Sequence, residues 1–565
     1  MPASYFPADT THGRSSRAPA VGRSGMVASA HPWATQAGLD VMKDGGNAFD
    51  AAVAVASSLN VAEPFMSGAG GIGVALLYVA SERKTHVLNF SGRAASGATP
   101  DQYDDETKQI GPKAPLVPGN AAGWVAWHEK YGRLPSRRVF RDAIEYARRG
   151  VPLSPFGAEM LQQNWGFLTR FESTRKSFLG GATTPPTVGS LFLQPDLGDS
   201  LTALAEGGRK EFYEGRLARA IVKSFQKAGG LLTLEDMAAT KAEWEEPLRT
   251  TYRGLEVRVP PPNSSGFQII ETLNILEGYS SLEFGTTETL HIMLEAVKLA
   301  IEDRVEHGGD PEFSKIPLQR LISKEYAAGL RARINPKKAF KQKKQRYPRE
   351  HLAAADGLPA EQPWLRARWQ DGDDWWTHGL TTHFAVVDSD GNAVTVTQTL
   401  GNGYGCGMVA DGTGLFLNNM CLWFDIDPST PSANLIGPGK RVDFCVAPTQ
   451  VFEHDRLRLS IGTPGSYGIL QTTLQMLTNF IDFGMNVQEA IEAPRFRLQE
   501  PGVMNFEGRF PQPLIDELNG LGHTITRLPQ GWSRAVGGAH GIQVTSHGTL
   551  LGGADPRRDG VALGL

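Results

Sequence analysis

Residues 381–399 read TTHFAVVDSDGNAVTVTQT, and this stretch decides the fold. Two segments of alternating apolar and polar residues flank the turn Asp388-Ser389-Asp390-Gly391-Asn392, a pattern that predicts a β-hairpin. With the turn centred on Asp390, the register sets Thr381 opposite Thr399, so that two hydroxyl groups face each other. The segment lacks the glycine at the sixth place and the later Glu of a calcium loop, which favours a simple hairpin.

The facing threonines suggest a catalytic use. A threonine hydroxyl is a weak nucleophile unless a base lies beside it, and an N-terminal threonine solves this problem with its own α-amine. For Thr381 to become such a terminus, the bond between Leu380 and Thr381 must be cut. On spacing alone, however, a plain hairpin in which threonine is present because it favours strands is the simpler interpretation.

The composition is that of a globular protein, with 41% hydrophobic and 21% charged residues among 565. A formal net charge of -4 gives no reason to expect a nucleic-acid partner. Cys406, Cys421 and Cys445 cannot form a disulfide framework and lack the spacing of a zinc site, which favours a reducing compartment. No secretory signal or run of about 18 apolar residues is visible, so we expect a cytoplasmic protein without a membrane partner.

Residues 1–24 are polar, and we expect them to form a flexible tail. The pattern then predicts helices from Trp33 and from Ala48, followed by a glycine loop and an apolar strand, which is typical of a layered α/β unit. From Thr381 onward the sequence is strand-like, with many Gly-rich turns. Amphipathic helical patterns occur near residues 137–149, 198–206, 215–228 and 288–304.

Gly68, Gly70 and Gly73 match the string of a dinucleotide-binding fingerprint. That motif needs a strand before it and a helix after it, whereas this sequence predicts the reverse order. The glycines therefore indicate a tight connection between a helix and a strand. No other pattern in the sequence predicts a cofactor or a metal site.

The hairpin is one of six blocks, in order GMVASAHPWATQAGLDVMKDGGNAFDAAVAV, VPGNAAGWVAWHEKYGRLP, EWEEPLRTTYRGLEVRVPPPNSSG, TTHFAVVDSDGNAVTVTQT, GPGKR and GTPGSYG. Together they resemble the γ-glutamyltransferase family of N-terminal-nucleophile hydrolases over nearly the whole chain beyond the tail. The resemblance implies a four-layer αββα fold of the α/β class, forming one unit from two autoprocessed subunits. These are a large subunit, residues 25–380, and a small subunit, residues 381–565.

The resemblance also implies roles for residues of the site. Self-cleavage between Leu380 and Thr381 would make Thr381 the nucleophile, and Thr399 would orient its hydroxyl. Main-chain amides of a Gly-Gly pair stabilise the oxyanion in the family, and Gly465 and Ser466 occupy that place. The partners implied are the two subunits of one precursor and a small-molecule amide substrate. Whether these units associate further stays open.

The groups that identify a glutamyl substrate in the family are replaced in this sequence. An arginine that binds the substrate carboxylate is replaced by Ser91, with Arg93 two residues on. The family's Asn corresponds to Gly401 here, with Asn402 beside it. Its Gln and Asp correspond to Met420 and Trp423, and its two paired serines to Phe444 and Cys445. The apolar replacements either line an altered acyl site or are core residues after a local realignment.

We therefore predict a self-processing N-terminal-threonine amidohydrolase with an altered, non-glutamyl acyl specificity. A charge-assisted hydrogen bond contributes about 1.5–3 kcal/mol, so losing the acid and amine contacts weakens selection of a glutamyl group. Only 12 residues separate Phe424 from Gly437, which favours an open site and hydrolysis by water. Two alternatives stay open: a true γ-glutamyltransferase or glutathione hydrolase that uses Arg93 and Asn402 as substitutes, and an unprocessed non-enzymatic relative.

Overall fold

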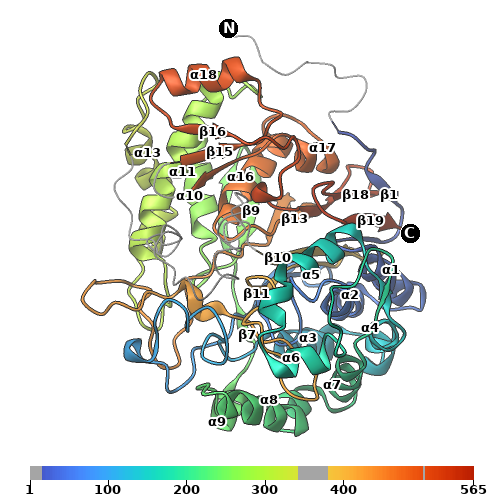
Figure 1. Ribbon diagram of the computed structural model, residues 1–565. Helices are drawn as coiled ribbons and strands as arrows, with labels where there is room; N and C mark the ends of the chain where they lie inside the picture. The colour runs from blue at the N-terminus through green and yellow to red at the C-terminus, as the bar shows by residue number, and fades with distance from the viewer. Residues whose placement is uncertain (1–14, 342–379, 500–502) are drawn as a thin grey trace.

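The computed structural model describes residues 15–341, 380–499 and 503–565, and its centre is a pair of seven-stranded antiparallel sheets (Figure 1). In order across the first sheet lie β1 (Ala20–Gly22), β18 (Leu550–Ala554), β17 (His540–Val544), β13 (Arg456–Gly462), β12 (Thr449–Glu453), β9 (Leu255–Val259) and β8 (Leu248–Tyr252). The second contains β19 (Val561–Gly564), β2 (Met26–Ser29), β10 (Leu380–Val387), β11 (Ala393–Gly401), β3 (Ile72–Val79), β4 (Lys84–Phe90) and β7 (Glu243–Glu245).

Helices cover the outer face of each sheet. Against the second sheet lie α1 (Pro32–Lys43), α2 (Ala48–Ala62) and α3 (Asn120–Tyr131), with α4 (Ser136–Arg149) packed on α2. Against the first lie α10 (Phe267–Leu276), α16 (Gly468–Ile481) and α17 (Val487–Glu492), with α11 (Thr287–His307) packed on α10. Figure 1 shows the strands running between these two groups of helices. The predicted four-layer αββα fold is confirmed.

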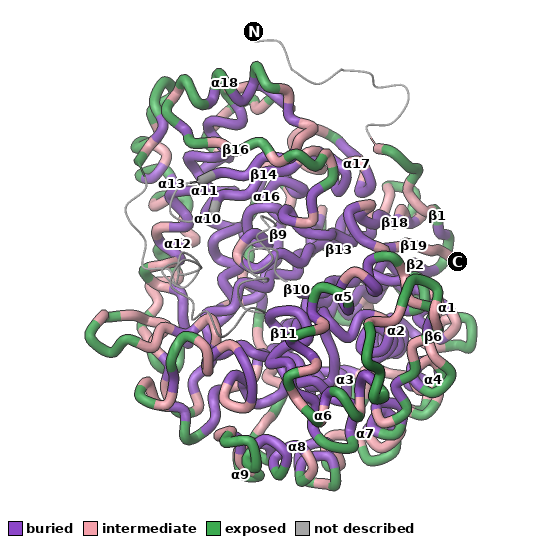
Figure 2. Tube along the Cα trace, viewed as in Figure 1, coloured by how far each residue is buried: buried purple, intermediate pink, exposed green. Residues whose placement is uncertain are grey.

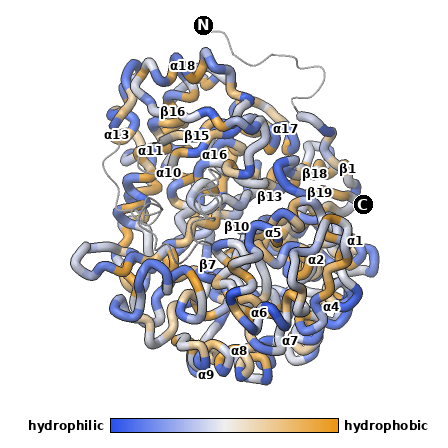
Figure 3. Tube along the Cα trace, in the orientation of Figure 1, coloured by the Kyte–Doolittle hydropathy of each residue, from blue (hydrophilic) through white to orange (hydrophobic). Residues whose placement is uncertain are grey.

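The remaining elements are peripheral. Two small sheets contain β5 (Val151–Pro152) with β6 (Leu191–Phe192), and β14 (Phe496–Gln499), β15 (Val503–Phe506) and β16 (Ile525–Arg527). The outer helices are α5 (Pro155–Leu168), α6 (Glu172–Ser177), α7 (Pro195–Tyr213), α8 (Arg216–Lys227), α9 (Leu234–Ala239), α12 (Leu318–Leu321), α13 (Lys324–Arg331) and α18 (Gln512–Gly520). Along α4 and α7 the hydropathy alternates, as expected of amphipathic helices (Figure 3). The four predicted helices are confirmed as α4, α7, α8 and α11. Helix α11, however, is buried without a break from Thr289 to Ile301, so the prediction that it is amphipathic is wrong.

The structure differs from the sequence-based expectation at two places. Residues 20–22 form strand β1, which pairs with β18, so the prediction of a flexible tail through residue 24 is wrong there. The strand-like pattern after Thr381 also includes the helices α16, α17 and α18. Helix α16 is buried on nearly every side and carries Thr and Gln within it, so it lacks the polar face by which a helix is recognised.

The hairpin lies at the centre of the second sheet. Its two strands are completely buried between β2 and β3, and Figure 2 shows them within the buried interior. On one face they meet β13 and β17 of the other sheet, and on the opposite face they meet α2. None of the helices in the described ranges has both the length and the apolar composition needed to cross a membrane.

Candidate active site

The hairpin has the register that the sequence predicts. Thr381 pairs with Thr399 and Val387 with Ala393. The turn is held by the Asp388 carboxylate, whose Oδ1 accepts hydrogen bonds from the amides of Asp390 at 3.0 Å and Asn392 at 2.9 Å. The predicted hairpin and its register are therefore confirmed.

An irregularity interrupts this pairing at the bond between Leu380 and Thr381. Leu380 pairs with Gly401 whereas Thr381 pairs with Thr399, so Leu400 has no opposite residue on β10. Such a bulge bends the strand and redirects the neighbouring side chains. Gly401 completes it with a φ of 98°, a conformation that favours glycine. The bulge thus lies at the bond predicted to be cut.

The Thr399 hydroxyl is hydrogen-bonded both to the predicted nucleophile, Thr381, and to the carbonyl oxygen of Leu380. Thr381 Oγ1 donates a hydrogen bond of 3.2 Å to Thr399 Oγ1, which in turn donates one of 3.0 Å to the carbonyl oxygen of Leu380. The amide of Gly401 donates to Thr399 Oγ1 at 2.7 Å and fixes its position. Both threonines are buried. The structure therefore brings together Leu380, Thr381, Thr399 and Gly401.

The turn that contains Gly465 and Ser466 lies between β13 and α16. Gly465 has a φ of 142° and Ser466 a φ of 53°, so the chain bends sharply just before the first turn of α16. At the end of β13, a Cβ on Gly462 would lie 2.4 Å from His383 Cε1, which shows how closely this strand approaches β10. The turn therefore begins three residues beyond a direct contact with the hairpin.

An aromatic cluster joins this turn to the segment that follows the hairpin. We define it as Trp423, Phe444 and Tyr467. The ring centroids of Trp423 and Tyr467 are 5.3 Å apart, and those of Trp423 and Phe444 are 6.2 Å apart. Met420 lies nearby, since its Sδ is 3.1 Å from the position of a Cβ on Gly401. The cluster thus adjoins the Gly465-Ser466 turn through Tyr467, whereas Met420 adjoins Gly401 at the end of β11.

Two buried charged residues, Asp443 and Arg304, contact the Tyr467 side chain of this cluster. The Tyr467 hydroxyl donates to Asp443 Oδ2 at 3.2 Å, and the Ser265 hydroxyl also bonds this carboxylate. The Arg304 guanidinium lies 4.1 Å from the centre of the Tyr467 ring and pairs with Asp443. Burial raises the pKa of Asp443, although Arg304 opposes this effect. Sequence reasoning missed these residues, for which the only signal was a charged Asp directly before Phe444.

Ser91 and Arg93 take part in interactions with the protein itself. Ser91 Oγ donates to Asn263 Oδ1 at 3.2 Å. The guanidinium of Arg93 donates to Glu243 at 2.8 Å and to both carboxylate oxygens of Glu312 at 2.7 Å and 3.0 Å. These carboxylates already occupy the planar donor face that a substrate carboxylate would need.

The other two predicted contacts differ from each other. The main-chain amide of Asn402 donates to Asn419 Oδ1 at 2.9 Å, which fixes its position. The side-chain Nδ2 of Asn402 has no hydrogen-bond partner among the described residues. The Cys445 thiol is fully buried, and burial raises its pKa far above the ordinary value. Asn402 therefore offers a buried donor beside the bulge, whereas Cys445 is an unreactive thiol.

Comparisons with known proteins identify the family of this chain. Residues 34–565 match the family model described as Gamma-glutamyltranspeptidase. The chain belongs to the γ-glutamyltranspeptidase family. The resemblance noted from the six sequence blocks is thereby confirmed.

Members of the γ-glutamyltranspeptidase family similar to this chain include acylases and glutathione hydrolases. The acylase ACY 1 proenzyme of Pseudomonas sp. (strain SE83) is 35% identical, over 97% of this chain and 94% of that protein. The glutathione hydrolase proenzyme of Escherichia coli (strain K12) is also 35% identical, over 95% of this chain and 91% of that protein. A crystal structure of cephalosporin acylase from Bacillus halodurans gives a TM-score of 0.86 at 31% identity, over 100% and 99% of the two chains.

Two further polar residues, Arg558 and Glu63, contact the hairpin of β10 and β11. The sequence analysis did not predict either of them. Arg558 Nη1 donates to the carbonyl oxygen of Thr381 at 3.1 Å. Thr382 points to the helix side of the sheet, where its hydroxyl donates to Glu63 Oε2 at 3.4 Å. The only signals in the sequence were a carboxylate at the end of an apolar helix and the run DPRRD near residue 558.

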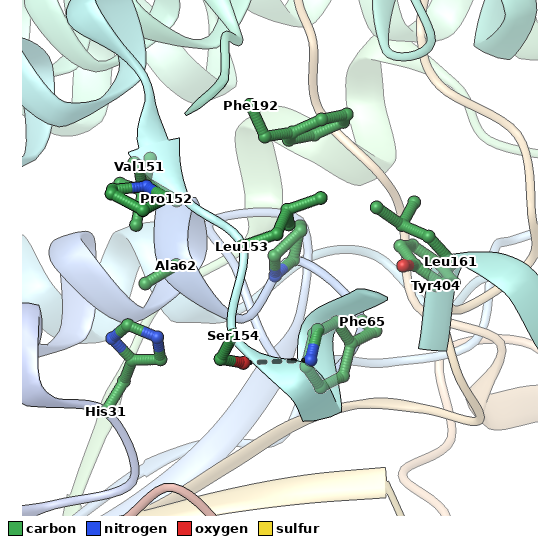
Figure 4. Close-up of a pocket in the computed structure, with 13 residues that line it drawn as sticks. His31, Ala62, Phe65, Val151, Pro152, Leu153, Ser154, Leu161, Phe192 and Tyr404 are labelled. Carbon is green, nitrogen blue, oxygen red and sulfur yellow. Dashed lines mark hydrogen bonds between the residues drawn. The ribbon is translucent and has the colours of Figure 1, made fainter. Parts of the chain in front are cut away.

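A separate pocket lies near the end of α2 (Figure 4). Phe65, Leu161 and Tyr404 surround it together with residues of β5, and the Ser154 hydroxyl beside it accepts a hydrogen bond from the Gly157 amide. None of its lining residues is a predicted site residue. This pocket is therefore separate from the predicted site residues.

Replacing Ser466 with glycine is expected to stabilise the protein. Ser466 adopts a positive φ of 53°, which for a residue with a Cβ costs roughly 1–2 kcal/mol, and glycine removes this cost. We expect the thermal unfolding midpoint to rise by about 1–2 °C with processing retained. Ser466→Ala is the matched control, because it removes the hydroxyl and keeps the strain. A lower midpoint for Ser466→Gly than for Ser466→Ala would contradict the argument.

Proposed function

We propose that this chain is a self-processing N-terminal-threonine amidohydrolase that acts through an acyl-enzyme on Thr381. The observation that carries this proposal is the hydrogen-bond chain from Thr381 through Thr399 to the Leu380 carbonyl. The names of the similar relatives support it, because they describe acylase and glutathione hydrolase proenzymes. The large subunit then comprises residues 25–380 and the small subunit residues 381–565.

Processing begins when Thr381 Oγ attacks the carbonyl carbon of Leu380. Negative charge develops on the carbonyl oxygen, which already accepts a hydrogen bond of 3.0 Å from the Thr399 hydroxyl. The peptide C–N bond breaks, the Leu380 acyl group passes to Thr381 Oγ, and the freed α-amine keeps the hydroxyl proton. Water then hydrolyses this ester, leaving a carboxylate on Leu380 and a free hydroxyl on Thr381. Once Leu380 departs, the Thr399 hydroxyl can donate to Thr381 Oγ instead.

Turnover repeats this chemistry on an external amide. The α-amine of Thr381 accepts the hydroxyl proton while Oγ attacks the substrate carbonyl. The main-chain amides of Gly465 and Ser466 stabilise the oxyanion of the tetrahedral intermediate. The α-ammonium gives its proton to the leaving amine, and water hydrolyses the acyl-enzyme.

The surroundings of the site support a less polar acyl group than glutamyl. Met420, Trp423 and Phe444 correspond, by the family resemblance, to polar groups that identify a glutamyl substrate. Both terminal nitrogens of Arg93 already donate to Glu243, Glu312 or the Gly439 carbonyl, so they are not free to bind a substrate carboxylate. A zwitterionic glutamyl group would therefore lose its water without gaining equivalent partners.

A panel of p-nitroanilides with the same leaving group tests this specificity. We expect kcat/KM for an apolar acyl anilide, such as phenylacetyl, to exceed that for the γ-glutamyl anilide by roughly 10-fold or more, because two charge-assisted contacts are missing. The glutaryl anilide separates the two effects, since it lacks only the α-amine of the glutamyl compound. A preference for the γ-glutamyl anilide would refute the altered specificity while leaving the mechanism intact.

A double variant provides the matched control. Phe444→Ser with Cys445→Ser introduces the paired hydroxyls that the family resemblance sets at these positions. We expect this variant to shift the kcat/KM ratio toward the γ-glutamyl anilide. An unchanged ratio would mean that these two residues do not contact the acyl group.

One observation favours a second candidate, a glutathione hydrolase. Asn402 Nδ2 is a buried donor without a partner among the described residues, and it lies next to the bulge. A substrate carboxylate is a suitable acceptor for it. In that case the γ-glutamyl anilide would be preferred, and Asn402→Ala would raise its KM more than that of the apolar anilide.

A further inference from the structure

Arg558 differs from the other buried arginines near the hairpin. Its Nη1 donates to the carbonyl oxygen of Thr381 and lies 3.5 Å from Met66 Sδ, while its Nε has no hydrogen-bond partner among the described residues. In the described ranges no carboxylate oxygen lies within the 4.0 Å of an ion pair from its guanidinium. The side chain is only 8% exposed.

Its neighbours are neutralised. Arg495 pairs with Asp555, and Arg557 pairs with Asp555 at 3.0 Å and with Glu507 at 2.6 Å. A buried guanidinium without a paired carboxylate is unfavourable for folding, and such perturbed groups concentrate at functional sites. The charge of Arg558 therefore requires an explanation that the ion-pair network does not give.

The contact of Arg558 survives the proposed cleavage. The cut removes the bond on the amino side of Thr381, whereas Arg558 binds the carbonyl on the other side of the same residue. Within one residue the nitrogen and the carbonyl oxygen are about 3 Å apart, so the guanidinium lies within about 6 Å of the new α-amine. A like charge at this distance disfavours protonation of the amine.

We propose that Arg558 is a positioning residue that keeps the α-amine of processed Thr381 neutral, and therefore able to act as a base, near neutral pH. This inference rests on the proposed function, since it needs the free terminus. Catalysis requires the amine to accept a proton from Oγ, which an ammonium group does not do. The positive charge of the guanidinium disfavours protonation of the amine, and its hydrogen bond to the carbonyl oxygen holds Thr381 in place.

The nearby histidines and Glu63 are largely uncharged near neutral pH, so they do not supply the positive charge that Arg558 brings to the Thr381 α-amine. Burial lowers the pKa of His383 well below the ordinary value and that of His540 to about 3, so both are uncharged near neutral pH. Burial raises the pKa of Glu63 to about 8, which leaves it largely protonated. Burial lowers the pKa of Arg558 itself to about 10, at which it stays charged. The remaining charges that act on Arg558 or Glu63 are those of Asp555, Asp559, Arg495 and Arg534.

The first test uses the processed wild-type protein. Cyanate carbamylates neutral amines, so the pH dependence of labelling reports the titration of the Thr381 α-amine. Lys440 is the single lysine of residues 381–565, and fragment masses separate it from the N-terminus. We expect a midpoint at least about one pH unit below the ordinary 7.7–8.0 of an α-amine. A midpoint of 8 or above would overturn the proposal, whereas an uncleaved chain would refute the proposed function instead.

The second test compares variants of the charge. We expect Arg558→Gln to move the acidic limb of the kcat profile upward by about one pH unit, and Arg558→Lys to restore it because the charge returns. A residue with only a structural role would lower kcat at every pH without moving this limb. Arg534→Gln, which removes an outer arginine paired with Glu159, is the matched control and should leave the limb unchanged. An unmoved limb in Arg558→Gln would refute the inference, and the labelling test decides the question if that variant fails to fold.

Discussion

Replacing Thr381 with alanine should leave one full-length chain without amidase activity. The methyl group has no nucleophile to attack the Leu380 carbonyl, so neither processing nor acyl-enzyme formation can occur. We expect hydrolysis to fall by on the order of 10⁴-fold or more. A denaturing gel and intact mass measurement should show fragments that end at Leu380 and begin at Thr381 in the wild type alone.

Two controls accompany this variant. Thr381→Ser keeps a hydroxyl and should still be cleaved, and Cys445→Ala removes a buried thiol and should leave cleavage intact. Full hydrolytic activity in a wild-type chain that stays uncleaved would disprove the mechanism. A wild-type chain that is both uncleaved and inactive would support the alternative of an unprocessed non-enzymatic relative.

Thr399→Val should uncouple the nucleophile from the bond that it attacks. Valine has nearly the shape of threonine but cannot accept from Thr381 Oγ1 or donate to the Leu380 carbonyl, both of which the wild-type hydroxyl does. Loss of one donor to a developing oxyanion slows a reaction by roughly 10²–10³-fold. We expect processing to slow by this factor in a gel time course, and kcat of the processed fraction to fall as well.

The neighbouring Thr397 provides the matched control for this change. It lies on the same face of β11, but its hydroxyl bonds His383 Nδ1 at 2.8 Å and not Thr381. Thr397→Val should therefore be processed far faster than Thr399→Val, and Thr399→Ser should resemble the wild type. Equal processing rates in Thr399→Val and the wild type would remove the second threonine from the mechanism.

Local sequence patterns were sufficient for the hairpin and for the amphipathic helices. Alternation with a period of two and a five-residue turn predicted the pairing of Thr381 with Thr399, because the length of the turn sets the register of a hairpin. The amphipathic helices α4 and α8 followed from their period of 3.6 residues. These features depend on neighbours in the chain, so the sequence contains the information directly.

The residues around the nucleophile depend on distant parts of the chain and could not be predicted in this way. Arg558 lies 177 positions from Thr381, and Glu63 lies 319 positions from Thr382. Only the finished fold brings these groups together. The pairing of Arg93 with Glu243 and Glu312 likewise depends on three separate segments, so no local pattern could show that its donors are occupied.

The strand order has a consequence for how the processed protein can unfold and refold. In the proposed two-subunit form, β10 and β11 of the small subunit lie between β2 and β3 of the large one, and the first sheet also combines strands from both. The proposed cut would therefore convert a unimolecular folding reaction into a bimolecular one without separating the native pieces. After complete denaturation, recovery of the processed enzyme should depend on protein concentration, whereas recovery of the uncleaved Thr381→Ala chain should not. The proposed cut needs the folded hairpin, because the pairing of β10 with β11 brings the Thr399 hydroxyl to the Leu380 carbonyl. Two separated subunits would therefore have to associate again before either could regain its native strand pairing.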